Sequence, residues 1–211
     1  MQYSAIVLCA GSGTRTGLNY NKMFYTLNGQ TIYEMIMKVF LNDPQCAQVV
    51  VVCKDSERTA FKQLITDERL TFVTGGAERQ DSVFAGLQAV TSEYVLIHDG
   101  ARPYLKQASI NALLDCLMTH DACLLMVPCV DTIKRVKDGK VITTFVRSEL
   151  MQAQTPQAFR TDLITKAYAT VIDQGLMATD DASMVELTGG DVYVVMGDYD
   201  NIKVTTKEDL Q

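Results

Sequence analysis

Short apolar runs alternate with helix-like segments along this 211-residue chain, and this alternation limits the folds available to it more than any other feature. The predicted strands cover residues 3–9, 48–53, 70–74, 94–97, 122–129 and 191–196, with a final extended piece at 201–205. The predicted helices cover residues 31–41, 56–67, 107–119, 160–173 and 181–188, and one more begins at Gln80 or Asp81. Such alternation predicts an α/β fold, a mostly parallel Rossmann-like sheet flanked by helices. Ligands bind such sheets at the carboxyl ends of the strands.

One segment interrupts the alternation and is predicted to form a β-hairpin. Residues 133–137 and 140–143 are extended runs on either side of Asp138-Gly139, a dipeptide typical of two-residue hairpin turns. A lone hairpin is marginally stable in water. We therefore expect an arm at about residues 131–150, within a single domain spanning 1–211, that packs on a second subunit. The alternative is a hairpin folded back on its own sheet.

The charge balance argues against two classes of partner. The chain carries 19 Lys and Arg against 25 Asp and Glu, a net charge of −6, whereas proteins that bind nucleic acids or membrane surfaces show a basic face. No apolar run approaches the ~20 residues of a membrane span, and no basic segment precedes the first apolar run as in a signal peptide. We therefore expect a cytoplasmic protein whose six cysteines are free thiols and whose two histidines form no metal site.

The first predicted strand runs into a glycine-rich loop, Ala10–Arg15, and Lys22 follows shortly after it. Glycines let the backbone bend tightly and bring its N–H groups against a ligand. Arg15 and Lys22 add positive charge beside this loop. The combination indicates a polyphosphate site, and the alternative is a plain strand-to-helix turn with two surface cations.

The glycine spacing excludes two common nucleotide-binding motifs. A dinucleotide fingerprint, G-x-G-x-x-G, would need a third glycine where Thr16 stands. A Walker loop, G-x-x-x-x-G-K-S/T, would need a lysine directly after Gly17, where Leu18 stands. The remaining pattern, G-S-G-T-R with a lysine after it, is typical of sugar-type nucleotidyltransferases.

Further glycines, cations and carboxylates occur where the predicted strands end. They lie in Gly75–Ser82, His98–Pro103, Asp131-Thr132 and Asn201–Thr205. Each has a structural explanation by itself, since Asp99 could cap a turn and Arg79 and Arg102 could be surface charges. Taken together with the opening loop, they predict one active cleft at the strand ends.

These segments, together with Gln154–Phe159 and Thr179–Ser183, occur in the order found in one enzyme family. Over nearly its whole length the chain resembles the 2-C-methyl-D-erythritol 4-phosphate cytidylyltransferases of the non-mevalonate isoprenoid pathway. The resemblance implies transfer of CMP from CTP to a phosphorylated polyol, 2-C-methyl-D-erythritol 4-phosphate, with release of pyrophosphate and with Mg²⁺ or another divalent cation as cofactor. It also implies a homodimer whose hairpin arms exchange and complete each other's clefts.

The same resemblance assigns the site residues. The catalytic cations are Arg15, Lys22 and Lys203. The CTP-binding residues are Ala10, Gly11, Ser12, Gly13, Gly75, Gly76, Arg79, Ser82, Asp99 and Ala101, and Asp99 is also the candidate metal ligand. The acceptor-binding residues are Arg102, Thr132, Arg147, Thr155 and Lys203.

The chain departs from the family pattern near the opening loop. Cys9, Asn21 and Met23 stand where family members often carry Ala, Pro and Gln. Arg15 and Lys22 are intact, so the departures concern the stiffness of the loop and not its chemistry.

The nearest alternative is a ribitol 5-phosphate cytidylyltransferase of cell-wall polymer synthesis, because those enzymes have a similar loop. They tend to carry Ser-Val where Gly100-Ala101 stands and to lack the Lys134-Arg135 pair, so this chain follows the methylerythritol pattern at both places. A more distant alternative is a non-catalytic regulator with the same fold. Loss of Arg15 or Lys22 would support that alternative, and both are present.

Overall fold

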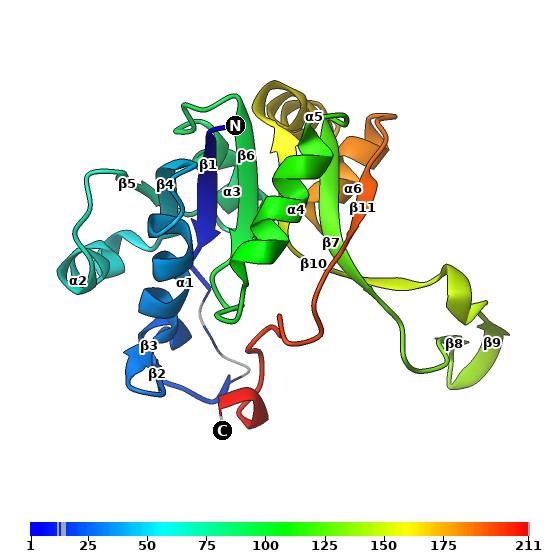
Figure 1. The fold of residues 1–211 in the computed structure, drawn as a ribbon. Coiled ribbons are helices and arrows are strands. Elements are labelled where there is room, and N and C mark those ends of the chain that lie inside the picture. The colour runs from blue at the N-terminus through cyan, green and yellow to red at the C-terminus, as the bar shows by residue number, and fades with distance from the viewer. Residues whose placement is uncertain (12, 14–15, 211) are drawn as a thin grey trace.

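The central sheet has seven strands in the order β11-β7-β10-β6-β1-β4-β5 in this computed structural model, which describes residues 1–11, 13 and 16–210 (Figure 1). The strands are β1 (Tyr3–Leu8), β4 (Cys46–Cys53), β5 (Leu70–Thr74), β6 (Tyr94–Asp99), β7 (Ala122–Pro128), β10 (Met151–Arg160) and β11 (Tyr193–Met196). Only β10 is antiparallel to its neighbours in this sheet, as far as the described residues show. The mostly parallel α/β fold predicted from the sequence is confirmed.

Helices cover both faces of the sheet (Figure 1). The helices α1 (Ile32–Leu41), α2 (Arg58–Leu64) and α4 (Gln107–Leu117) pack on one face, and α3 (Arg79–Leu87), α5 (Thr161–Asp173) and α6 (Asp181–Leu187) pack on the other. Successive side chains of a strand point to opposite faces. In β1, Ala5 and Val7 therefore join the first core cluster and Ile6 joins the second. Two buried faces explain why the parallel strands are apolar throughout.

Short 3₁₀ turns and one small hairpin connect these elements. The turns are η2 (Lys22–Phe24), η3 (Asp55–Glu57), η4 (Arg147–Glu149) and η5 (Glu208–Leu210), and the hairpin consists of β2 (Thr26–Leu27) and β3 (Gln30–Thr31). None of the described helices is long and apolar enough to span a membrane. All six cysteines are free thiols, as predicted.

The sequence analysis missed β10, which lies between β6 and β7 in the middle of the sheet. Its sequence contains Pro156, and a proline inside a run argues against a central strand because it cannot donate to the ladder. In the structure, the pairing of β10 with β7 is irregular between Ala153 and Gln157, and this irregularity accommodates the proline. Prolines within sheets are found at such bulges.

The predicted hairpin forms and projects away from the sheet (Figure 1). It consists of β8 (Lys134–Lys137) and β9 (Lys140–Thr144), joined at Asp138 and Gly139, whose φ angles are 51° and 75°. Two successive positive φ angles are those of a type I′ hairpin turn. Every residue from 131 to 149 is exposed, so the arm does not fold back on its own sheet.

Candidate active site

A cavity of about 530 Å³ opens at the carboxyl ends of β1, β4, β5 and β6. The residues that line it and that were assigned from the sequence are Ala10, Gly11, Lys22, Gly75, Gly76, Arg79, Ser82, Asp99, Ala101 and Lys203. The lining also includes Asn21 and Lys54, to which the sequence analysis gave no role. Segments far apart in the sequence thus meet in one cleft at the strand ends.

The remaining assigned residues form two groups. Ser12 and Arg15 are outside the part of the chain that the structure describes. The assigned residues that the structure describes but that do not line the cavity are Gly13, Arg102, Thr132, Arg147 and Thr155. Of these, Thr132 and Arg147 are exposed on the arm, where the Arg147 guanidinium donates to Val130 O at 3.1 Å.

The extended piece near the end of the chain carries one lysine of the cavity, Lys203, and holds a second, Lys22, through its backbone. The Lys22 ammonium donates to Val204 O at 2.7 Å. The Lys203 ammonium lies 2.6 Å from a carboxylate oxygen of Asp99. Val204 N–H in turn donates to Ala101 O at 2.8 Å, which fixes this piece against the end of β6. Two cations from opposite ends of the sequence are therefore held at one cavity.

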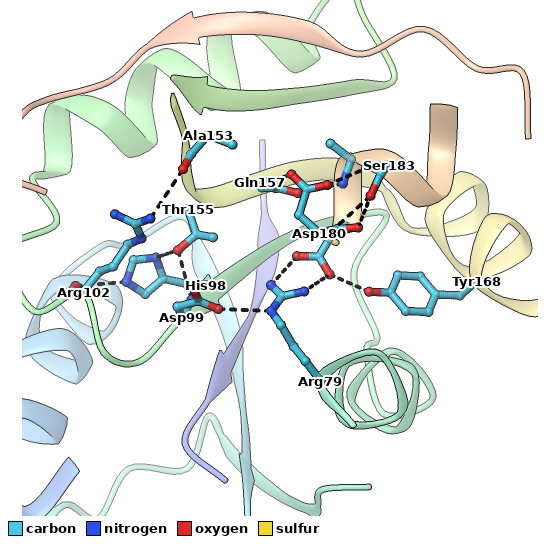
Figure 2. Close-up of polar contacts among 12 residues, drawn as sticks. Arg79, His98, Asp99, Arg102, Ala153, Thr155, Gln157, Tyr168, Asp180 and Ser183 are labelled. Atoms are coloured by element: carbon cyan, nitrogen blue, oxygen red, sulfur yellow. Dashed lines mark hydrogen bonds and ion pairs between the residues drawn. The ribbon is translucent and has the colours of Figure 1, made fainter. Parts of the chain in front are cut away.

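Asp99 is the last residue of β6 and lies between two cations, Lys203 and Arg79; Figure 2 shows the Arg79 contact. Besides Lys203, it has Arg79 Nε at 3.3 Å from its other oxygen. Burial alone would raise the pKa of Asp99, but Arg79 and Lys203 outweigh it and lower that pKa well below its usual value. Asp99 is therefore ionised at neutral pH.

Arg79 is itself fixed by a second carboxylate, on the side away from Asp99 (Figure 2). It is the first residue of α3, and its two terminal nitrogens donate to the Asp181 carboxylate at 2.9 and 2.7 Å. Asp181 is fully buried and also accepts from the Tyr168 hydroxyl at 2.5 Å. A bidentate pair of this kind fixes the guanidinium plane. The orientation of Arg79 toward Asp99 is thus set from α5 and α6.

Thr155 and Arg102 lie behind Asp99 (Figure 2). Asp99 N–H donates to the Thr155 hydroxyl at 3.0 Å, and His98 Nδ1 lies 3.1 Å from that hydroxyl. His98 Nε2 faces Arg102 O at 3.1 Å, so Nε2 carries the ring proton and Nδ1 accepts from Thr155. Arg102 donates to Asn201 O at 2.6 Å. These contacts support the end of β6 and the 201–204 piece from outside the cavity.

The glycine turn after β5 leaves little space beside it. Gly75 N–H donates to Cys53 O at 3.0 Å, and Gly76 N–H donates to the Ser82 hydroxyl at 3.1 Å. A Cβ at Gly76 would lie 2.3 Å from the Asp81 Cβ, and one at Gly75 would lie 2.9 Å from the Ala10 Cβ. Only glycine fits at both positions, and the turn forms a narrow rim with backbone polar groups on it.

The metal-ligating side chains at the cavity suit a metal ion that binds together with a nucleotide. They do not suit one that the protein alone would hold. The described residues contain no group of three or more His, Cys, Asp or Glu side chains that could hold a metal ion. Mg²⁺ is usually bound through one or two carboxylates together with substrate phosphates. Asp99 at the cavity meets the first requirement, and a triphosphate would meet the second.

Comparison with known proteins identifies the family. The family model for 2-C-methyl-D-erythritol 4-phosphate cytidylyltransferase (IspD) matches residues 3–211. A relative of that name from Geobacillus thermodenitrificans (strain NG80-2) is 45% identical over 215 residues, which cover 100% of this chain and 94% of the relative. Another from Bacillus licheniformis is 41% identical over 215 residues, covering 100% and 93%.

A solved structure has the same fold. It is the 4-diphosphocytidyl-2C-methyl-D-erythritol synthase from Anaerococcus prevotii DSM 20548, with a TM-score of 0.89, 30% sequence identity and coverage of 99% of this chain and 94% of that chain. Both the sequence relatives and the fold agree with the resemblance found in the sequence. The chain belongs to the 2-C-methyl-D-erythritol 4-phosphate cytidylyltransferase family.

Proposed function

We propose that this chain transfers CMP from CTP to 2-C-methyl-D-erythritol 4-phosphate and releases pyrophosphate, as a step of isoprenoid precursor biosynthesis. Family membership indicates the substrates. The observation that carries the proposal is the cavity at the strand ends, where Lys22, Lys203 and the ionised Asp99 meet the glycine-rich loop. A cleft of this kind suits an anionic nucleotide in a chain whose overall charge is negative.

The reaction needs little acid–base chemistry from side chains. An oxygen of the acceptor's phosphate is largely ionised at neutral pH, because the second pKa of a phosphate monoester is about 6. It attacks the α-phosphorus of CTP and forms a new P–O bond. The bond from the α-phosphorus to the bridging oxygen breaks, and pyrophosphate leaves with that electron pair. The protein must therefore supply alignment and charge neutralisation.

Lys22, Lys203 and Arg15 supply the positive charge in this proposal. Lys22 is half-buried and its ammonium is held near Val204, beside the loop that would cradle the phosphates. It stabilises the negative charge that builds on the α-phosphate. Lys203 is 39% exposed, so its ammonium has room to turn from Asp99 to an incoming phosphate. Arg15 shares this role by family resemblance.

A divalent cation such as Mg²⁺ would supply further charge neutralisation when bound. Asp99 is the residue that would hold it, and the ion would neutralise charge on the triphosphate. On the other wall, the Gly75-Gly76 rim and the Ser82 hydroxyl read the edge of the cytosine. No side chain fits at these two glycines, so the rim presents its backbone groups directly to the base.

The acceptor site requires a second copy of the chain in this proposal. Thr132 and Arg147, which are assigned to the acceptor phosphate, lie at the two ends of the arm and not at their own cavity. The arm also exposes large apolar side chains, namely Val136, Val141, Ile142, Phe145 and Val146, which are 44–59% exposed. Apolar surface of this extent is typical of an interaction site. A homodimer with exchanged arms would cover it and complete both clefts.

The test is a pyrophosphate-release assay with Mg²⁺, each nucleoside triphosphate and a set of acceptors. We expect turnover with CTP and 2-C-methyl-D-erythritol 4-phosphate, well ahead of ribitol 5-phosphate and a sugar 1-phosphate as acceptors. We also expect CTP to exceed ATP and GTP by a large factor, since a polar site that loses its partner discriminates strongly. Faster turnover with ribitol 5-phosphate, or equal use of ATP and CTP, would contradict the proposal.

A further inference from the structure

We propose that Asn21 is a positioning residue for Lys22, and this proposal rests on the catalytic role of Lys22 proposed above. Asn21 directly precedes Lys22 and is 4% exposed. It lies at the edge of the cavity, at the point where the chain returns from the glycine-rich loop to the short turn η2. Its side-chain amide forms three hydrogen bonds, and two of them leave the turn to reach other elements.

The three bonds use both ends of the amide. Asn21 Oδ1 accepts from Met23 N–H at 3.1 Å. Asn21 Nδ2 donates to Cys9 O at 2.7 Å and to Glu57 Oε2 at 2.8 Å. Cys9 is the residue at which β1 leads into the glycine-rich loop, and Glu57 belongs to η3 after β4. One buried amide therefore connects the backbone beside Lys22 to the ends of two neighbouring central strands.

Helix capping alone does not explain this arrangement. A capping side chain needs only its acceptor, which binds the N–H two or three residues later. Here the capped turn spans three residues, and the donor end of the amide makes the two shorter bonds outside it. The contacts to Cys9 and Glu57 instead fix the separation between the glycine-rich loop and the backbone of Lys22.

This separation matters because of the lysine side chain. A lysine is a point charge on a flexible four-carbon stem, so its ammonium is placed only as well as its backbone. Lys22 reaches from η2 to Val204 O, and its position relative to the loop is set at the preceding residue. A displacement of about 1 Å at a positioning group can cost ~10² in rate. We therefore expect loss of the Asn21 bonds to act on kcat.

The experiment compares kcat and KM for CTP in Asn21→Ala and in two variants of its partner Glu57, which does not line the cavity. We expect Asn21→Ala to lower kcat by at least ~10-fold, with KM for CTP changed by less than ~3-fold. Glu57→Ala should also lower kcat at unchanged KM, by a smaller factor. Glu57→Gln should restore near wild-type kcat, because its amide oxygen still accepts from Asn21 Nδ2.

Thr31→Ala is the matched control. Thr31 is the side-chain cap of α1, away from the cavity, and its loss should lower the free energy of unfolding without changing kcat. The double variant Asn21→Ala/Glu57→Ala should lose no more kcat than Asn21→Ala alone, because both changes remove the same bond.

Two results would overturn the proposal. One is unchanged kcat in Asn21→Ala while Lys22→Ala is inactive. The other is full kcat in Glu57→Ala together with a raised KM for CTP in Asn21→Ala, which would mean that Asn21 binds the nucleotide itself. If Asn21→Ala does not fold, comparison of kcat in Glu57→Ala and Glu57→Gln still tests the positioning role of Asn21. Full activity of Lys22→Ala would refute the proposed function of Lys22 instead, and so the two failures are distinguishable.

Discussion

Asp99 holds two cations at the cavity before any substrate is present, Lys203 at one oxygen and Arg79 at the other. An incoming triphosphate competes with this carboxylate for Lys203. Arg79 is less free to turn toward the triphosphate, because its guanidinium is also bound by the Asp181 carboxylate. Of the two cations beside Asp99, Lys203 can therefore turn toward a phosphate, and Arg79 stays in place. This division follows from where each side chain is anchored, and not from its charge.

At the scale of the residue, we predict that Lys22→Ala lowers kcat by at least ~10² while KM for CTP changes much less. An interaction made mainly in the transition state has this signature, and removal of one preorganised donor costs about this factor. Steady-state kinetics of pyrophosphate release measure both constants. Lys38→Ala, which changes an exposed lysine on α1, is the control and should match the wild type. Near wild-type turnover in Lys22→Ala would contradict the assignment.

A second prediction at this scale concerns His98 and acid stability. Burial lowers the pKa of His98 to about 4 from a value of 6.5. Between these values the unfolded chain binds a proton that the folded chain does not. The folded state is thus favoured above pH 6.5, and His98 lowers the free energy of unfolding as pH falls toward 4, by at most ~1.4 kcal/mol per pH unit.

Urea unfolding at pH 7, 6 and 5 measures this contribution. We expect a shallower loss of stability with falling pH in His98→Gln than in the wild type. The control is His120→Gln, which makes the same substitution at the other histidine. Equal slopes in the wild type and His98→Gln would show that His98 does not carry the effect.

At the scale of the element, periodicity and turn chemistry predicted most of the sheet and the arm from the sequence. The parallel strands are apolar runs bounded by turns, and Asp138-Gly139 marks the arm because its turn needs positive φ at both residues. The strand β10 could not be found in this way. Its place in the sheet comes from pairing with β6 and β7, which lie on both sides of it in space.

The same reasoning explains which site residues could be predicted. The glycine turns and the lysines follow strand ends, and strand ends meet at one edge of a sheet. The role of Asp181 could not be inferred from spacing, because its partner Arg79 is 102 positions away. Asn21 was marked only by its departure from the family pattern; its contacts could not be inferred, since an asparagine in a loop is common and its partners come from separate segments.

The arm carries the prediction that belongs to this scale. Arg147 offers a planar fork suited to a phosphate. We expect Arg147→Ala to raise KM for the phosphorylated acceptor and to leave KM for CTP nearly unchanged. Lys140→Ala, at the tip of the arm beside the turn, is the matched loss of charge and should have little effect. If KM for CTP rises as much as KM for the acceptor, Arg147 does not belong to the acceptor site.

At the scale of the whole molecule, we predict that activity requires a homodimer. If each arm completes the other chain's cleft, a mixture of inactive Lys22→Ala and inactive Arg147→Ala chains should recover activity after subunit exchange. Each heterodimer then has one cleft with both defects and one with neither. The measurement is pyrophosphate release after mixing, with exchange confirmed by a tag on one of the two variants. Confirmed exchange without recovered activity would show that the arm serves its own chain or no site.

The contact between Lys22 and Val204 spans 182 positions of the sequence. The site therefore cannot be complete until synthesis of the chain has passed Val204. A ribosome adds about 5–20 residues per second, so Val204 is made roughly 10–40 s after Lys22. Until then the emerging chain has its glycine-rich loop and Asp99, but neither Lys203 nor the carbonyl that holds Lys22. The cleft is therefore assembled last, and a ribosome that stalls before this point leaves a chain without a complete cleft.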